Sequence, residues 1–373
     1  MKKAGFLFIV LFFLLNGCKE NNPVEPQEAL KLEFQRIIDS LYNNSGVSTG
    51  VIINVKIPAD GFSFQYAAGF SDKINRTPLT AQHKVCIASN TKTFVAALIM
   101  ILKEQNKLSL DDKLTRYFDA SLVDSLCVYN NQSYGKEITI KMLLNHTSGI
   151  PDFESDEFVL NFLQSPYEFW SPLRTIRYAA ANLPATNIPG TAFHYSNTNY
   201  NLLGLIAEKA GGGQLHDLLR THIYIPSRIY GAYMNGYEQG DGYVAKGYFL
   251  DSTEVSNYNM SWEWACGGIM STMEEMNLFL TSLLAGKLFT NPSTLTEMLH
   301  FENDKYALGV LQLNRDNFNF IGHTGGALGY SSVMLYEKNL DAYFSIVVNS
   351  SGESDLFLQV LLKLAAKLTT RCN

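Results

Sequence analysis

Segments with the pattern of β-strands lie towards both ends of the chain, and helical patterns fill the stretch between them. Residues 47–57 and 62–69 alternate apolar and polar side chains, and the turn composition of residues 58–61 predicts that they form a hairpin. Four further segments follow at hairpin spacing near the other end of the chain: 306–312, 317–322, 330–336 and 341–349. Since a sheet must bury an apolar face, we expect one antiparallel sheet built from both ends of the chain. The predicted fold class is α/β of the α+β type, an antiparallel β-sheet flanked by helices with an inserted helical lobe.

Of the segments with helical patterns, three bear most on the fold. Residues 30–42 carry an apolar stripe on one side and should form the first helix. Residues 93–107 are apolar on almost every side at their start, which predicts a helix buried nearly all round. Residues 354–371 read as an amphipathic helix that closes the chain. A reactive group at the start of the second of these helices would therefore be held rigidly.

Length and composition predict a two-lobed globular domain that does not bind nucleic acid. The 373 residues exceed one small domain, so we expect residues 30–373 to form two lobes around one cleft. The helical lobe would take in about residues 83–229, and the sheet lobe would combine residues 30–82 with 230–373. The net charge of −6 and the lack of any basic run remove the electrostatic footprint that nucleic acids require. No feature of the sequence selects an oligomeric state.

The first residues have the pattern of an export signal. Lys2 and Lys3 precede an apolar run over residues 5–15, which is short for a membrane-spanning helix. The run ends at Leu-Asn-Gly-Cys18, which resembles the bacterial lipobox, in which the cysteine is lipidated. We therefore expect a signal peptide over residues 1–17 and a lipid-anchored tether over residues 18–29. The alternative is a plain secretory signal with an incidental cysteine.

Residue 19 is Lys rather than the Asp that retains many lipoproteins at the inner membrane. The expected location is therefore the outer membrane, on the face towards the periplasm.

The remaining four cysteines indicate neither a metal site nor thiol chemistry. Cys86, Cys127, Cys266 and Cys372 are too widely separated for a zinc-binding pattern. An oxidising compartment permits disulfides, and four cysteines allow three pairings. Cys86 lies close to the serine motif described next, but a small buried core residue is the favoured interpretation. No metal is predicted.

The sequence Ser89-Asn-Thr-Lys92 opens the predicted buried helix. Positions three apart lie on the same face of a helix, so the Lys92 amine should lie within proton-transfer reach of the Ser89 hydroxyl. The helix N-terminus adds partial positive charge beside Ser89. Burial should lower the pKa of Lys92 and let it act as a base. A helix-capping serine followed by an exposed lysine is the structural alternative, because Ser-x-x-Lys alone is a weak pattern.

Two further elements add chemistry to this pair. Residues 193–197 (FHYSN) precede a predicted helix, where Tyr195 could shuttle a proton and Asn197 could hold both Lys92 and a substrate carbonyl. Residues 323–326 (HTGG) lie in the strand-rich part, and their glycines would let a substrate backbone approach the strand edge. The structural alternatives are a buried aromatic beside a helix cap and a glycine-rich hairpin.

In this order the three elements resemble those of the serine β-lactamase and penicillin-binding protein superfamily, in its branch of class C β-lactamases and DD-peptidases. That family carries Ser-x-x-Lys, Tyr-x-Asn and Lys/His-Thr-Gly. Residues 143–151 (LLNHTSGIP) and 189–204, from Pro-Gly-Thr to Leu-Gly, are also similar to family segments. The resemblance covers about residues 30–370.

The resemblance implies a role for each motif residue. Ser89 would be the nucleophile, Lys92 and Tyr195 would share general base and acid work, and Asn197 would position the substrate. The backbone N–H groups of Ser89 and Gly326 would form the oxyanion hole. Of the remaining motif residues, His323 and Thr324 would face the substrate carboxylate, and Gly325 belongs to the same substrate-binding strand. His146, in the segment 143–151, is expected to be structural.

One departure bears on the activity. Class C β-lactamases usually have Lys at the position of His323, and a histidine is largely neutral at neutral pH. Histidine occurs in family DD-peptidases and in esterase-like members. The leading hypothesis is therefore a D-alanyl-D-alanine carboxypeptidase or a related DD-peptidase.

A β-lactamase or a small-ester esterase that uses the same residues is the nearest alternative, since one site architecture hosts all three reactions. A catalytically silent, lipid-anchored binding protein is the alternative from another class. The joint presence of Ser89, Lys92, Tyr195 and Asn197 argues against it. The mechanism needs no metal or organic cofactor, so none is predicted, and the expected partners are a peptide, β-lactam or ester substrate and, through the lipid anchor, a membrane.

Overall fold

The computed structural model describes residues 24–240, 243–302, 305–352 and 355–370. It confirms the predicted fold class, because one antiparallel sheet takes its strands from both ends of the chain. The strand order is β11-β12-β13-β14-β1-β2-β3. The strands are β1 Gly50–Ile57, β2 Phe62–Asp72, β3 Thr77–Pro78, β11 Leu311–Arg315, β12 Phe318–Ala327, β13 Tyr330–Glu337 and β14 Ala342–Val348. The central pairing of β1 with β14 therefore joins the two ends of the chain.

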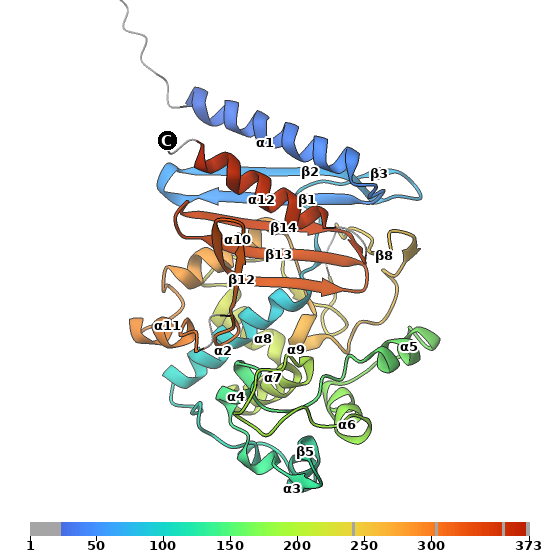
Figure 1. Ribbon diagram of the computed structural model, residues 1–373, viewed down its shortest axis with the longest axis vertical. Coiled ribbons are helices and arrows are strands. Elements are labelled where there is room, and N and C mark those ends of the chain that lie inside the picture. The colour runs from blue at the N-terminus through green and yellow to red at the C-terminus, as the bar shows by residue number, and fades with distance from the viewer. Residues whose placement is uncertain (1–23, 241–242, 303–304, 353–354, 371–373) are drawn as a thin grey trace, which may run out of the picture.

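Two terminal helices cover one face of the sheet. Helix α1, Val24–Asn44, and helix α12, Leu356–Thr369, lie side by side over it (Figure 1). Phe34 and Ile38 of α1, four residues apart, are fully buried against the sheet together with Leu364 of α12.

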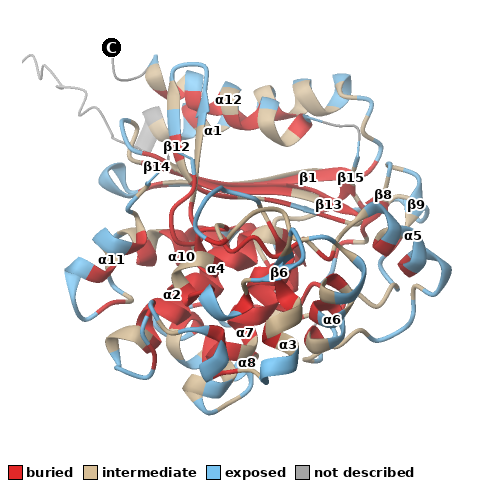
Figure 2. Ribbon diagram, turned by 60° about the horizontal axis from the view of Figure 1, so that its bottom comes forward, coloured by how far each residue is buried: buried red, intermediate tan, exposed pale blue. Residues whose placement is uncertain are grey.

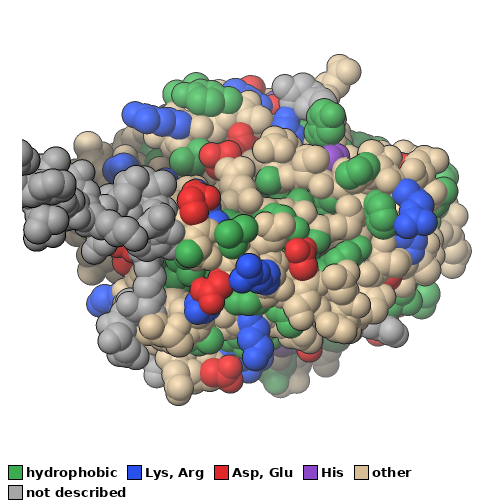
Figure 3. Space-filling view, turned by 90° about the horizontal axis from the view of Figure 1, so that it is seen from above, with side chains coloured by type: hydrophobic (Ala, Val, Ile, Leu, Met, Phe, Trp, Pro, Cys, Tyr) green, Lys and Arg blue, Asp and Glu red, His purple; other side chains and the backbone are tan. Residues whose placement is uncertain are grey.

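On the surface seen from above, acidic and basic side chains are interspersed rather than separated by sign (Figure 3).

The other face of the sheet carries the helical part of the chain. Helix α10, Met273–Leu284, packs on β1 and β14, and beyond it lie α2, Thr91–Glu104, and α7, Asn197–Gly211. Figure 2 shows that the buried residues gather where these helices meet the sheet and one another. Residues 91–102 of α2 are all buried, which confirms the prediction from their apolar composition. The core thus encloses the helix that begins just after Ser89.

Shorter elements complete the helical part and the loops around it. The helices are α3 Ala120–Leu126, α4 Ile140–Leu144, α5 Asp156–Gln164, α6 Pro172–Asn182, α8 Leu215–Leu219, α9 Trp264–Gly267 and α11 Pro292–Met298. Two-residue and three-residue strands form small sheets: β4 Val85–Cys86, β5 Val128–Tyr129, β6 Gln132–Ser133, β7 Tyr233–Met234, β8 Tyr248–Phe249, β9 Thr253–Glu254, β10 Ile269–Ser271 and β15 Ser350–Ser351. Among their described residues, positions 230–261 contain only the two-residue strands β7, β8 and β9.

Several boundaries differ from expectation: strand β12, predicted over residues 317–322, runs on to Ala327, and two further differences concern β11 and α1. The strand predicted over residues 306–312 begins only at Leu311, because the chain turns at Gly309. Gly309 has a φ of +75°, and a Cβ there would lie 2.3 Å from the Cβ of Ala96, so the turn is fixed by close approach to α2. At the other end, α1 starts at Val24. Residues 24–29 of the expected tether are therefore helical, with Pro26 in the first turn, where proline is tolerated.

The expected signal peptide, the lipidated Cys18 and the cysteine at 372 lie outside the described residues. Within the described ranges, none of the helices combines the length and apolar composition needed to cross a membrane.

Candidate active site

Ser89 lies in a tight turn just before α2. Residues 88–90 form a 3-10 turn that continues directly into the helix at Thr91. Ala88 has a φ of +50°, a left-handed conformation that is costly for a residue with a Cβ. Ala88 and Asn90 are fully buried, whereas Ser89 between them is partly exposed. The packed surroundings hold this strained backbone and thereby present the serine side chain.

Lys92 joins Ser89 to the second motif. Its ammonium is completely buried and lies 2.9 Å from Ser89 Oγ, 2.6 Å from Asn197 Oδ1 and 2.7 Å from the backbone oxygen of Cys266. These three contacts use the three N–H donors of an ammonium group. The structure therefore brings Ser89, Lys92 and Asn197 together, although Asn197 is 105 residues from Lys92 in the chain.

Tyr195 completes this cluster from the loop that precedes α7. Its ring centroid lies 4.9 Å from Lys92 Nζ, and its hydroxyl interacts with both Lys92 and Ser89. Burial raises the pKa of the Tyr195 hydroxyl, and the interactions with Lys92 and Ser89 offset part of that rise. The phenol is therefore protonated in the resting site.

The expectation that burial would lower the pKa of Lys92 is wrong for this arrangement. Desolvation does lower it, but Tyr195, Cys266 and Asp152 together outweigh that effect, and the pKa of Lys92 is raised. In the resting site Lys92 is an ammonium that donates to Ser89. Because neither an ammonium nor a phenol is a base, the Lys92 and Tyr195 pair must first release one proton, and only then can it accept the proton of Ser89.

Strand β12 supplies the third motif and a free edge. Its ladder with β11 runs from Phe318 to Gly322, so in the described part of the chain residues 323–327 pair with β13 alone. Gly325 lies against the turn that holds Ser89, because a Cβ at this position would be 2.5 Å from the oxygen of Ile87. Gly326 follows on the open side and is exposed. Thr324, between His323 and these glycines, is partly exposed.

A pair of glycine variants tests this close approach. Gly325→Ala should lower the melting temperature by several degrees, because its methyl group must push β12 away from the Ser89 turn. Gly326→Ala is the matched control, since nothing lies within 4 Å of a Cβ there, and its melting temperature should match that of the wild type. Thermal unfolding of the three proteins decides the matter. Equal destabilisation by both substitutions would contradict the packing described.

His323 does not face the cleft as the family resemblance implied. Its side chain is only 2% exposed. Nδ1 donates to the Thr324 oxygen at 2.5 Å, which leaves Nε2 to accept from the Tyr306 hydroxyl at 3.0 Å. Burial, and secondarily the charge of Lys92, lower the pKa of His323 to about 3. The histidine is therefore a neutral, inward-pointing part of the strand, and it supplies no positive charge for a substrate carboxylate.

Sequence reasoning missed three carboxyl groups beside Lys92. Asp152 and Glu154 follow the segment 143–151, and both accept hydrogen bonds from Asn197 Nδ2, at 3.2 and 2.7 Å. Glu263, 4% exposed, lies under the site, and burial raises its pKa to about 7. The acidic residues immediately after LLNHTSGIP were a usable signal for the first two. No comparable signal marked Glu263.

His146 and the cysteines have structural surroundings. His146 is buried, accepts the Ser196 N–H at Nδ1, and has a pKa held well below its usual range by burial. Cys86, Cys127 and Cys266 are free and buried. Burial raises the pKa of Cys86 well above its ordinary value, so its thiol is not a nucleophile at neutral pH. No group of three or more His, Cys, Asp or Glu side chains suited to a metal ion occurs among the residues that the structure describes.

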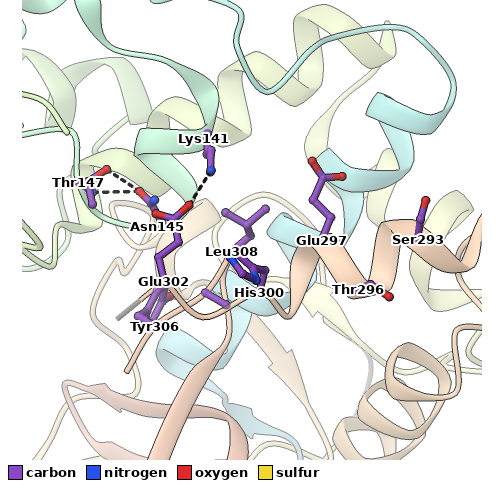
Figure 4. A pocket seen from close by; sticks show the side chains of 11 residues that line it. Lys141, Asn145, Thr147, Ser293, Thr296, Glu297, His300, Glu302, Tyr306 and Leu308 are labelled. Carbon is purple, nitrogen blue, oxygen red and sulfur yellow. Dashed lines mark hydrogen bonds and ion pairs between the residues drawn. The ribbon is translucent and has the colours of Figure 1, made fainter. Parts of the chain in front are cut away.

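A separate pocket of about 410 Å³ adjoins the site behind Tyr306. Its walls come from α4 and the loop after it, from α11, and from the chain around Leu308 (Figure 4). Lys141 and Glu302 form an ion pair of 2.7 Å at its side. Tyr306, which bonds His323, separates this pocket from the cluster around Ser89, and Ser89, Lys92, Tyr195 and Asn197 do not line it.

Comparisons with known proteins agree with this geometry. Penicillin-binding protein 4* of Bacillus subtilis is 26% identical over 325 residues, which cover 81% of this chain and 68% of that protein. Protein flp of Staphylococcus aureus is 26% identical, and the match covers 83% of this chain but only 60% of that protein. The D-amino acid amidase of Ochrobactrum anthropi SV3, in complex with L-phenylalanine amide, is similar in fold, with a TM-score of 0.77, 24% identity, and coverage of 91% and 99% of the two chains. The family model described as Beta-lactamase matches residues 34–367, and the chain therefore belongs to the β-lactamase family of serine hydrolases.

Proposed function

We propose that this serine hydrolase cleaves bonds that follow a D-alanyl residue, as in D-alanyl-D-alanine-type peptides, through an acyl-enzyme on Ser89. The contact of 2.9 Å between Lys92 Nζ and Ser89 Oγ carries the proposal, because it links a partly exposed hydroxyl to a buried proton relay. Penicillin-binding protein 4* and the D-amino acid amidase, which resemble the chain in sequence and in fold, support it.

The proposed reaction has two halves. In the form of the site in which the Lys92 and Tyr195 pair has released one proton, Ser89 Oγ attacks the carbonyl carbon while its own proton passes into that pair, and the oxyanion is met by the backbone N–H groups of Ser89 and Gly326. The C–N bond then breaks, and the proton held by the pair goes to the leaving nitrogen. Water attacks the ester carbonyl in the second half, gives its proton to the same pair, and Ser89 recovers a proton as the acid departs.

A second candidate is the hydrolysis of uncharged amides or small esters. The observation that favours it is His323, whose buried and neutral imidazole leaves this motif without a charge for a terminal carboxylate. A leaving group without a carboxylate would suit such a site better than the C-terminal residue of a peptide. A β-lactam remains a further substrate to be tested at the same serine.

Turnover of a short substrate panel tests the proposal. D-alanyl-D-alanine, D-alaninamide, p-nitrophenyl acetate and benzylpenicillin are each incubated with the full chain, and products are measured by mass spectrometry. The expected result is release of D-alanine from the first two and little release from their L-configured counterparts. Hydrolysis of benzylpenicillin alone would identify a β-lactamase and contradict the proposal, and hydrolysis of p-nitrophenyl acetate alone would identify an esterase.

We also propose that the protein is an envelope lipoprotein anchored through Cys18, on the outer membrane and facing the periplasm. The pattern of residues 1–18 supports this location. Metabolic labelling with a fatty acid, with Cys18→Ser as the unlabelled control, tests it.

A further inference from the structure

Asn197 has no amide hydrogen left for a substrate. Its Oδ1 accepts from Lys92, and its Nδ2 donates to Glu154 Oε2 at 2.7 Å and to Asp152 Oδ2 at 3.2 Å. A side-chain amide has only two N–H donors, so both are occupied. A substrate whose amino group is acylated brings a carbonyl oxygen to this part of the cleft. That oxygen would find no donor on Asn197.

Asp152 and Glu154, whose carboxyl groups both bond Asn197, differ in the number of hydrogen bonds that they accept. Asp152 accepts the backbone N–H groups of Asn197 and Glu154 at Oδ1, in addition to the amide at Oδ2, and so fixes the loop against α7. Glu154 is bonded only through Oε2 in the described part of the chain. Its Oε1 has no hydrogen-bond partner there and is accessible to solvent. Glu154 thus presents one free carboxyl oxygen beside the catalytic cluster.

In the described part of the chain, the carboxyl groups around Glu154 outnumber the cations buried beside them. Asp152, Glu154 and Glu263 lie around a single ammonium, that of Lys92, which is itself bonded to Ser89, Asn197 and Cys266. Removal from water, followed by the charges of Glu263 and Asp152, raises the pKa of Glu154 to about 8, and Lys92 only partly opposes this. With this pKa the carboxyl group is largely protonated near neutral pH, and a second cation placed at Oε1 would favour its ionised form. Among the described residues no second cation contacts Oε1, which leaves this role to a ligand.

We infer that Glu154 binds the free ammonium group of the substrate, so that the enzyme acts on D-aminoacyl amides, esters or peptides whose acyl residue carries an unblocked amino group. This inference rests on the proposed acylation of Ser89 by a D-aminoacyl group. A free ammonium donates N–H groups to Oε1. An acylated amine would instead place a carbonyl oxygen in this region. Three consecutive hydrogen bonds, through Lys92 and Asn197, join Ser89 to Glu154, so the recognised nitrogen lies close to the bond that is cleaved.

Binding measured without turnover tests the inference. Isothermal titration calorimetry is performed on the full chain carrying Ser89→Ala, with D-alaninamide and N-acetyl-D-alaninamide as the two ligands. D-alaninamide should bind at least about tenfold more tightly, and adding Glu154→Gln should remove most of that preference, because glutamine keeps the volume and loses the charge. Glu157→Gln is the matched control on the exposed first turn of α5, and it should leave the preference unchanged.

Several outcomes would overturn the inference. These are equal binding of the two ligands, tighter binding of the acetylated one, failure of D-alaninamide to bind, or an unchanged preference in the Glu154→Gln protein. A melting curve for each variant shows that the fold is intact. Selective binding of D-alaninamide by the Ser89→Ala protein, combined with no turnover by the wild type, would contradict the proposed function and leave the ammonium site standing.

Discussion

The Ser89→Ala variant should lose hydrolysis of D-alanyl substrates by a factor of about 10³–10⁶ while keeping its fold. The reason is that no other nucleophile in the cluster can replace the hydroxyl that Lys92 and Tyr195 serve. Lys92 would keep its bonds to Asn197 and Cys266, so the site should not collapse. Initial rates at matched protein concentration measure the loss.

Ser121→Ala is the control for this substitution. Ser121 is an exposed serine on α3, far along the chain from the cluster, and its loss should not change the rate. A Ser89→Ala protein that hydrolyses D-alanyl substrates at more than a small fraction of the wild-type rate would show that the reaction occurs elsewhere.

Lys92→Ala should have the second large effect, on both activity and stability. Turnover should fall by about 10²–10⁴-fold, which is the range for removing a positioned proton-transfer group. Removal of the ammonium also leaves Asp152, Glu154 and Glu263 without their buried counter-charge, at a cost of about 3–5 kcal/mol in the free energy of unfolding. Denaturant unfolding measures the second quantity.

This loss of stability should grow as the pH rises. The pKa values of Glu154 and Glu263 in the folded protein, about 8 and about 7, exceed their ordinary value of 4.5. Between pH 4.5 and about pH 8 the folded state therefore holds more protons than the unfolded state, and the free energy of unfolding falls as the pH rises through this range. Since Lys92 lowers both values, its removal raises them further and steepens that fall. The Lys92→Ala deficit should therefore be larger at about pH 8 than at about pH 5.

Lys103→Ala is the matched control on the same helix. Lys103 forms a partly exposed ion pair with Glu297, and such a pair is worth about 1 kcal/mol or less. Its deficit should be small and nearly independent of pH in this range. A Lys92→Ala deficit no larger than that of Lys103→Ala would contradict the role given to the buried ammonium.

Much of the fold followed from local patterns. The strands β12, β13 and β14, the buried helix α2 and the helix α12 lie where alternation and helical periodicity placed them. The turn at Gly309 could not be foreseen, because it depends on contact with Ala96 more than two hundred residues earlier in the chain.

The identity of the motif residues in the candidate site could be predicted from the sequence. Their protonation and burial could not, because these depend on the residues around them. Ser89, Lys92 and Asn197 meet as their motifs suggested. The protonation of Lys92 and the burial of His323 were not predictable, because each depends on groups from several elements. Glu154 stands out only once the hydrogen bonds of Asn197 are counted.

Acylation of Ser89 can be observed by intact-mass spectrometry of the full chain after rapid acid quenching during turnover of D-alaninamide. The expected result is a species heavier than the protein by one alanyl group, with the addition located on the peptide that contains Ser89 and absent from Ser89→Ala. Turnover without any such species, or an addition on another residue that persists in Ser89→Ala, would contradict it.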